Sequence, residues 1–171
     1  MLTTQNIGEL PEYSKGYVDL LPKNDSLFTI FEKQSNNAYD FYAQIPEDKL
    51  LYRYAEGKWT IKEILLHIID VERILAYRSL RFARTDNNEL PGFDQDKYVL
   101  HSKANERNWE ELQQEFKIVR QSTILLFKNF DKEMLLESGL ANNYRFSVNA
   151  MGFMIAGHEL HHRIIIQERY L

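Results

Sequence analysis

Apolar side chains recur at helical spacing in four long segments of the chain. Residues three and four positions apart lie on one face of an α-helix, so this spacing predicts amphipathic helices. We expect these helices over residues 26–45, 60–84, 108–130 and 148–169. The sequence shows no convincing alternating strand pattern, internal repeat or low-complexity tract. It therefore predicts an all-α four-helix bundle.

Capping signals mark where the predicted helices begin. Thr60 precedes the second helix and Glu63 follows three residues later, which is the spacing of a capping box. Trp59 stands before the cap, where a hydrophobic staple belongs. Polar residues 24–26 offer side chains to cap the first helix, and Ser147 offers one to the fourth.

The segments between the helices are polar and irregular. Residues 1–24 contain two glycines and two prolines and are expected to form a lead-in without regular structure. Residues 85–101 form a long connection from the second helix to the third, and loops of this length often serve as lids or substrate walls. We expect a short helical piece at 131–137 and a polar turn at 142–143. The long connection leaves both an up-down and a crossover topology open.

Composition narrows the possible function. The 171 residues suit one domain over residues 1–171, and the absence of cysteine excludes both disulfides and thiolate metal sites. A formal charge of −4 and the lack of a Lys/Arg-rich run argue against nucleic-acid binding. No apolar run approaches the roughly 20 residues of a membrane span, and no signal peptide pattern is visible. We expect a cytoplasmic protein with a small-molecule substrate.

Histidines are the candidate metal-binding residues of this chain. His158 and His162 lie one turn apart on the apolar face of the last predicted helix, with Cβ atoms roughly 5–6 Å apart, and His67 flanks the apolar stripe of the second helix. Three neutral imidazoles with an open fourth position describe a catalytic type of zinc site, in which the pKa of a bound water falls toward about 7. A lone buried histidine is more often satisfied by hydrogen bonds in the core. Spacing alone leaves both interpretations open.

The segment from His158 to His162 also matches the H-E-x-x-H pattern, in which Glu159 would be the general base of a metalloprotease. Glu168 is the only acidic residue beyond His162, and it is too close behind to be a third ligand of the familiar kind. We therefore do not expect a peptidase. We expect His161 to lie near the site or on the surface.

Four short segments together resemble the DinB-like superfamily of metal-binding four-helix proteins. They are Trp59–Glu63, His67–Arg73, Leu90–Asp94 and Gly157–Arg163. Relatives in this superfamily include bacillithiol, mycothiol and glutathione-linked S-transferases and metal-dependent hydrolases. The resemblance implies a divalent ion, zinc or nickel, with water completing its coordination, and a homodimer. It places the three metal-binding histidines of the family at His67, His158 and His162.

The resemblance favours an enzyme in which the metal activates a low-molecular-weight thiol, such as bacillithiol, for transfer to a small electrophile. Two alternatives stay open: a hydrolase of the same family and a non-enzymatic metal- or ligand-binding protein of the stress response. Asp70 and Arg73 match acidic and basic family positions, although an ion pair on the helix surface explains them equally simply. Asp94 is expected either to orient a ligand or to stabilise its turn. Aromatic residues expected to serve packing are Tyr52, Tyr54 and Trp109.

Overall fold

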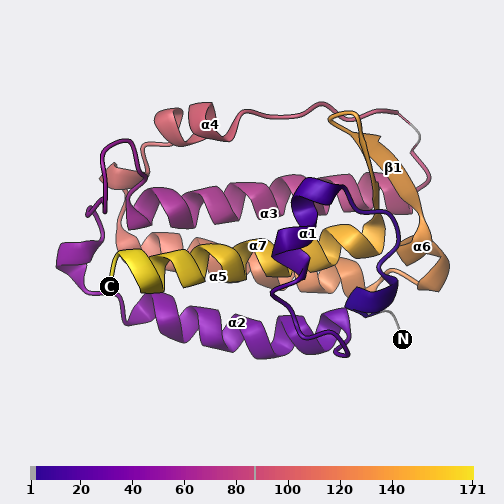
Figure 1. The fold of residues 1–171 in the computed structure, drawn as a ribbon, viewed down its shortest axis with the longest axis horizontal. Helices are drawn as coiled ribbons and strands as arrows, with labels where there is room; N and C mark the ends of the chain where they lie inside the picture. Colours follow the sequence, from indigo (N-terminus) through magenta and orange to yellow (C-terminus); the bar gives the residue numbers. More distant parts are fainter. Residues whose placement is uncertain (1–2, 87) are drawn as a thin grey trace.

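The computed structural model describes residues 3–86 and 88–171 and shows a bundle of four long helices (Figure 1). These helices are α2 (Leu27–Ala43), α3 (Ile61–Ala83), α5 (Trp109–Lys128) and α7 (Val148–Arg169). Each begins and ends within two residues of its predicted range, and the all-α four-helix expectation is confirmed. Residues 1–2 of the predicted lead-in and residue 87 of the predicted long connection lie outside the described residues.

Side-chain caps set the starts of the long helices. Thr60 Oγ1 accepts a hydrogen bond from the Glu63 backbone N–H at 3.1 Å, and the Thr60 N–H donates to the Glu63 carboxylate at 2.7 Å. This is the predicted capping box, which satisfies backbone groups that have no partner inside the helix. Ser26 caps α2 and Ser147 caps α7 in the same manner, each accepting from the N–H three residues later.

Contacts along the helices establish a crossover topology. Lys62 donates to the Arg107 carbonyl at 2.6 Å near the starts of α3 and α5, and Glu72 pairs with Arg120 further along both helices, so these two helices run parallel. The segment between them must therefore return along the whole bundle, as the path through α4 in Figure 1 shows. Helix α7 runs antiparallel to α3, since Ser79 near the end of α3 contacts Met151 near the start of α7. Helix α2 packs on α5 and α7.

Two segments predicted to be irregular contain short helices. The lead-in holds η1 (Thr4–Asn6) and α1 (Glu12–Val18), and the long connection holds α4 (Gln95–His101). A further short helix, η3 (Ala104–Glu106), follows this connection before α5. The prediction of a lead-in without regular structure is therefore wrong for residues 4–6 and 12–18, and the prediction of an irregular connection is wrong for residues 95–101. Helix α1 packs on α7, and tertiary packing of this kind stabilises a seven-residue helix that is too short to form alone.

The structure also contains a β-hairpin, which the sequence pattern did not predict. Strands β1 (Ser138–Ala141) and β2 (Tyr144–Ser147) pair antiparallel, with Ser138 opposite Ser147. The two turn residues, Asn142 and Asn143, have φ values of 54° and 64°, the conformation of a type I′ hairpin turn, which asparagine tolerates well. The remaining short elements are η2 (Glu47–Lys49) and α6 (Lys132–Leu136), the second of which was predicted.

The core is divided into two apolar clusters along the bundle. One contains Val71 of α3 and Met154 of α7, and the other contains Ile64 of α3 and Ile166 of α7. The candidate histidines of the same two helices lie between these positions, so apolar side chains flank them on both sides along the helix axes. In the part of the chain that the structure describes, no helix has the length and hydropathy needed to span a membrane.

Candidate metal centre

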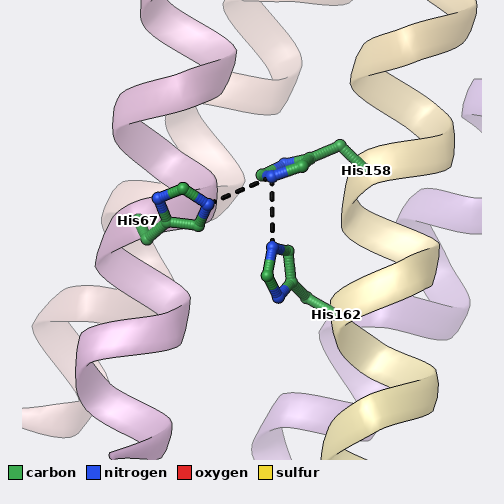
Figure 2. A group of neighbouring side chains, drawn as sticks. All are labelled: His67, His158 and His162. Atoms are coloured by element: carbon green, nitrogen blue, oxygen red, sulfur yellow. Dashed lines mark hydrogen bonds between the residues drawn. The ribbon is translucent and has the colours of Figure 1, made fainter. Parts of the chain in front are cut away.

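The structure brings the three predicted histidines together. His67 projects from α3, and His158 and His162 project from successive turns of α7, so that the rings converge in the space between the two helices (Figure 2). The Nε2 atom of His158 lies 3.1 Å from Nε2 of His67 and 3.1 Å from Nε2 of His162. His67 and His158 are buried, and His162 is partly buried.

The two short contacts at His158 Nε2 cannot both be ordinary hydrogen bonds. A neutral imidazole nitrogen carries either a proton to donate or a lone pair to accept with. It therefore cannot form two ordinary hydrogen bonds at once, although two other ring nitrogens lie at hydrogen-bonding distance from it. A cation placed among the three nitrogens removes the conflict, because each would then direct a lone pair toward the ion.

The spacing fits a common ion. Two nitrogens that each lie roughly 2.0–2.1 Å from one ion are separated by about 2.9–3.4 Å, depending on whether the angle at the ion is octahedral or tetrahedral. The 3.1 Å separations of His158 Nε2 from the other two nitrogens fall in this range, and the ligand atoms of all three histidines lie within 4.8 Å of one another. The three rings are inclined to one another by 63° to 80° rather than stacked, and Figure 2 shows ring nitrogens of His67 and His162 facing His158. The three residues present thus fit a divalent metal.

Burial keeps all three imidazoles in the neutral form that binds metals. It lowers the pKa of His67 to about 4. Burial, followed by the nearby imidazoles of His67 and His161, lowers the pKa of His162 to about 3. The pKa of His158 is well below the usual value for the same reasons, with burial as the largest cause. At neutral pH, protons therefore compete little for these nitrogens.

Two aromatic side chains hold the histidine rings from outside. The indole of Trp59 lies against His67 with the ring centroids 4.8 Å apart. Tyr17 of α1 contacts His158 edge to face, with centroids 5.4 Å apart. The sequence indicates Trp59 only as a hydrophobic staple of the helix, and Tyr17 lies in a segment predicted to be irregular. Neither contact has a local sequence signal, since each depends on how distant elements pack.

Three other candidates have structural contacts of their own. Arg73 approaches Asp70 at 4.0 Å and pairs more closely with Glu115 of α5 at 2.6 Å, which makes this an ion-pair network at the surface. Asp94 caps α4 by accepting hydrogen bonds from the N–H groups of residues 96 and 97, both at 3.1 Å. The contacts of Asp70 and Arg73 thus match the surface ion pair, and those of Asp94 match the stabilising role in its turn, that the sequence allowed.

Glu159 lies in the interface between α2 and α7. Its carboxylate is fully buried and accepts hydrogen bonds from Gln34 at 2.6 Å, Tyr42 at 3.2 Å and Arg163 at 3.1 Å. These partners occupy the carboxylate away from the histidine cluster, which agrees with setting the H-E-x-x-H interpretation aside. His161 packs against Tyr17 with ring centroids 5.1 Å apart and is not one of the converging ligands.

The predicted packing aromatics have packing contacts. Tyr52 and Tyr54 both meet Tyr170 edge to face, and Trp109 meets Tyr42. Tyr54 also lines a cavity of about 240 Å³ that is bounded by Trp59 and His162.

A second cavity, of about 200 Å³, is lined by His158 on the other side of the cluster. Small molecules can therefore reach the histidines from two directions. A larger cavity of about 380 Å³ lies between the starts of α2 and α7, away from the histidines, and includes Asn149.

Three proteins are reported as similar to this chain. A protein of Oceanobacillus iheyensis, named as a predicted metal-dependent hydrolase, is 29% identical over 75 residues, which cover 43% of this chain and 43% of its own length. YfiT from Bacillus subtilis is described as a probable metal-dependent hydrolase with an unusual four-helix bundle topology. It superposes with a TM-score of 0.72 at 12% identity, covering 86% of this chain and 90% of YfiT.

A mycothiol-dependent maleylpyruvate isomerase superposes with a TM-score of 0.69 at 10% identity, covering 96% of this chain and 62% of the isomerase. At such identities the two superpositions establish the fold alone. The family model described as the DinB superfamily matches residues 30–166, a range that contains all three converging histidines. Because this match extends over most of the chain, the protein belongs to the DinB superfamily.

Proposed function

We propose that this protein is a metal-dependent enzyme that transfers a small thiol to electrophilic small molecules. In this proposal His67, His158 and His162 are the protein ligands of the metal. The observation that carries it is the pair of 3.1 Å contacts on one nitrogen of His158, which two hydrogen bonds cannot satisfy and a shared cation can.

The residues around the cluster hold the histidine rings in place and leave room for reactants. A divalent ion such as zinc or nickel, when bound, supplies a Lewis acid that deprotonates a coordinated thiol or lowers the pKa of a water. Trp59 and Tyr17 limit rotation of the rings of His67 and His158. The two cavities beside the cluster leave room for two reactants. Since the sequence contains no cysteine, the thiol must come from a cosubstrate.

We place thiol transfer before hydrolysis because one structural neighbour is described as a mycothiol-dependent enzyme. Hydrolysis is the second candidate, because the Oceanobacillus protein and YfiT are both described as metal-dependent hydrolases. The same histidines and the same ion would serve either reaction, with water in place of the thiol.

Product analysis separates these possibilities. Metal-loaded protein is incubated with an epoxide or a chlorinated aromatic acceptor, with and without bacillithiol or glutathione. We expect a thioether conjugate to form faster than without protein, and the rate to fall to background after chelation and in His158→Ala. His101→Ala changes an exposed histidine of α4 outside the cluster and serves as the matched control. Absence of conjugate with every thiol would overturn the transferase proposal, and thiol-independent hydrolysis would favour the second candidate.

A further inference from the structure

Arg78 is a buried cation whose contacts are all with neutral groups. It exposes only 7% of its surface and projects from α3. Its Nη2 donates to the Pro91 carbonyl at 2.7 Å, and its guanidinium carbon lies 5.9 Å from the ring centroid of Phe93. Within residues 3–86 and 88–171, no carboxylate comes within 4.0 Å of Arg78.

The other deeply buried arginine shows what Arg78 lacks. Arg120 of α5 is fully buried and forms a two-pronged ion pair with Glu72, with nitrogen–oxygen distances of 2.8 to 3.1 Å. A buried charge is costly unless it is paired, which is why such a partner is the rule inside proteins. Arg78 has no such counter-charge among the described residues, and its nitrogens are not among the buried polar atoms that lack a partner, so its remaining donors reach the cavity and are available to an anion that enters it.

The position of Arg78 connects it with the histidine cluster. Arg78 and His158 line the same cavity of about 200 Å³. Arg78 follows His67 by eleven residues, which places the two within about 20° on one face of α3 and about 16 Å apart along the helix axis. The cavity walls combine apolar and aromatic side chains with the polar side chains of Gln95 and Asn142; the apolar and aromatic residues include Val71, Leu75, Tyr17, Phe93 and Met154. This shape suits an elongated molecule with an anionic end at Arg78.

We propose that Arg78 binds the carboxylate of a small-molecule cosubstrate whose reactive end lies at the histidine cluster. The assignment of the reactive end rests on the proposed function, whereas carboxylate binding at Arg78 does not require it. The planar guanidinium matches a carboxylate with two parallel hydrogen bonds. Arg78 is the one cationic side chain among the described residues lining the cavity, which suits a monoanionic carboxylate better than a phosphate dianion.

Binding of unreactive acids tests the inference without any turnover. The probes are S-methylglutathione, which represents the thiol side, and 3-phenylpropionate, which represents an acidic acceptor, each compared with its methyl ester. Calorimetry on metal-free and metal-loaded protein should show at least one acid binding about tenfold or more tightly than its ester. Which acid shows the preference tells whether the carboxylate belongs to the thiol or to the acceptor.

Variants of Arg78 assign the preference to this residue. Arg78→Gln keeps a donor for the Pro91 carbonyl but removes the charge, so acid and ester should bind equally. Arg78→Lys keeps the charge without the planar fork and should retain part of the preference. Arg73→Gln removes an exposed arginine of the same helix and should leave the preference unchanged. Thermal unfolding of each variant verifies that the bundle is intact.

The outcomes separate this inference from the proposed function. If the wild-type protein binds acids and esters alike, or if Arg78→Gln and Arg78→Lys both fold and keep the full preference, the inference is overturned. If the acid preference depends on Arg78 while the protein neither binds metal nor forms a conjugate, the carboxylate site stands and the proposed function falls.

Discussion

Trp59 offers an optical probe of the histidine cluster, because its indole lies against His67 with a centroid separation of 4.8 Å. A paramagnetic ion bound by that histidine would quench the indole efficiently at this range. We predict that Ni²⁺ added to metal-free protein quenches tryptophan fluorescence in a saturable manner. The chain has one other tryptophan, Trp109, which packs on Tyr42 instead.

Two variants assign the signal. Trp59→Phe should lose most of the quenching, and Trp109→Phe should retain it. The placement of the ion beside His67 would be contradicted if removal of Trp109, rather than Trp59, abolished the response.

Protonation of the histidines should weaken the metal-free protein in mild acid. Burial lowers the pKa of His67 to about 4, whereas an unfolded histidine titrates near about 6.5. Between these values the unfolded state binds a proton that the folded state excludes, so the free energy of unfolding falls as pH falls through this window. The stability associated with neutral His67 is complete above about pH 6.5.

Urea denaturation at about pH 7 and about pH 5 checks this prediction on chelated protein. His67→Gln cannot titrate, and its free energy of unfolding should therefore fall less between the two pH values than that of the wild type. An equal fall in both proteins would show that His67 does not resist protonation in the fold.

At the scale of the elements, the parallel packing of α3 and α5 is centred on a buried ion pair. Glu72 and Arg120 expose 2% and 0% of their surfaces, and Arg120 also lies over the rings of Phe31 and Phe116. Removing one partner leaves an uncompensated buried charge. We predict that Glu72→Gln lowers the free energy of unfolding by about 3–5 kcal/mol, measured by urea denaturation.

A matched control lies one residue away on the same helix. Arg73→Gln breaks a partly exposed pair with Glu115 and should cost about 1 kcal/mol or less. Similar losses in the two variants would mean that the Glu72–Arg120 pair is not a dominant contact between the helices.

Helix α1 depends on a close approach to α7. A Cβ at Gly157 would overlap the backbone carbonyl of Tyr17, while a Cβ at Gly16 would meet no atom. We predict that Gly157→Ala lowers the free energy of unfolding by about 1–3 kcal/mol. Gly16→Ala should be neutral or stabilising by up to about 1 kcal/mol, because alanine is the better helix former. A Gly157→Ala protein as stable as the wild type would show that α1 is not held this closely.

The long helices were predictable because their apolar stripes and caps are local features, as at Thr60 and Glu63. Helix α1 and the hairpin were not, since each is short and is stabilised by contacts with distant segments. The same distinction between local features and distant contacts applies to the histidine cluster. Spacing predicted the pairing of His158 with His162, but the contact of Tyr17 with His158 depends on where α1 packs.

The sequence contains a feature that marks Arg78 as a candidate functional residue, although it was not among the predicted site residues. It lies on the face of α3 that carries His67, eleven residues later, and an arginine on a buried face requires an explanation. What the sequence could not show is that Pro91 and Phe93, rather than a carboxylate, are its neighbours.

At the scale of the whole molecule, the crossover between α3 and α5 allows the centre to form. Helix α3 lies between α5 and α7, so one of its faces carries Glu72 toward α5 and another carries His67 toward α7. Helix α3 thus carries a buried ion pair on one side and a histidine of the candidate metal centre on the other. The homodimer and the cytoplasmic location implied earlier stay predictions.

The metal content of the protein tests the central claim most directly. Protein purified without a histidine tag is analysed for bound metals, as isolated and after chelation and reloading with zinc or nickel. We predict about one divalent ion per chain for the wild type and for His101→Ala, and none for His158→Ala, with helical circular dichroism retained in all three. A wild-type protein that takes up no metal, or a His158→Ala protein that binds as much as the wild type, would contradict the assignment of the centre.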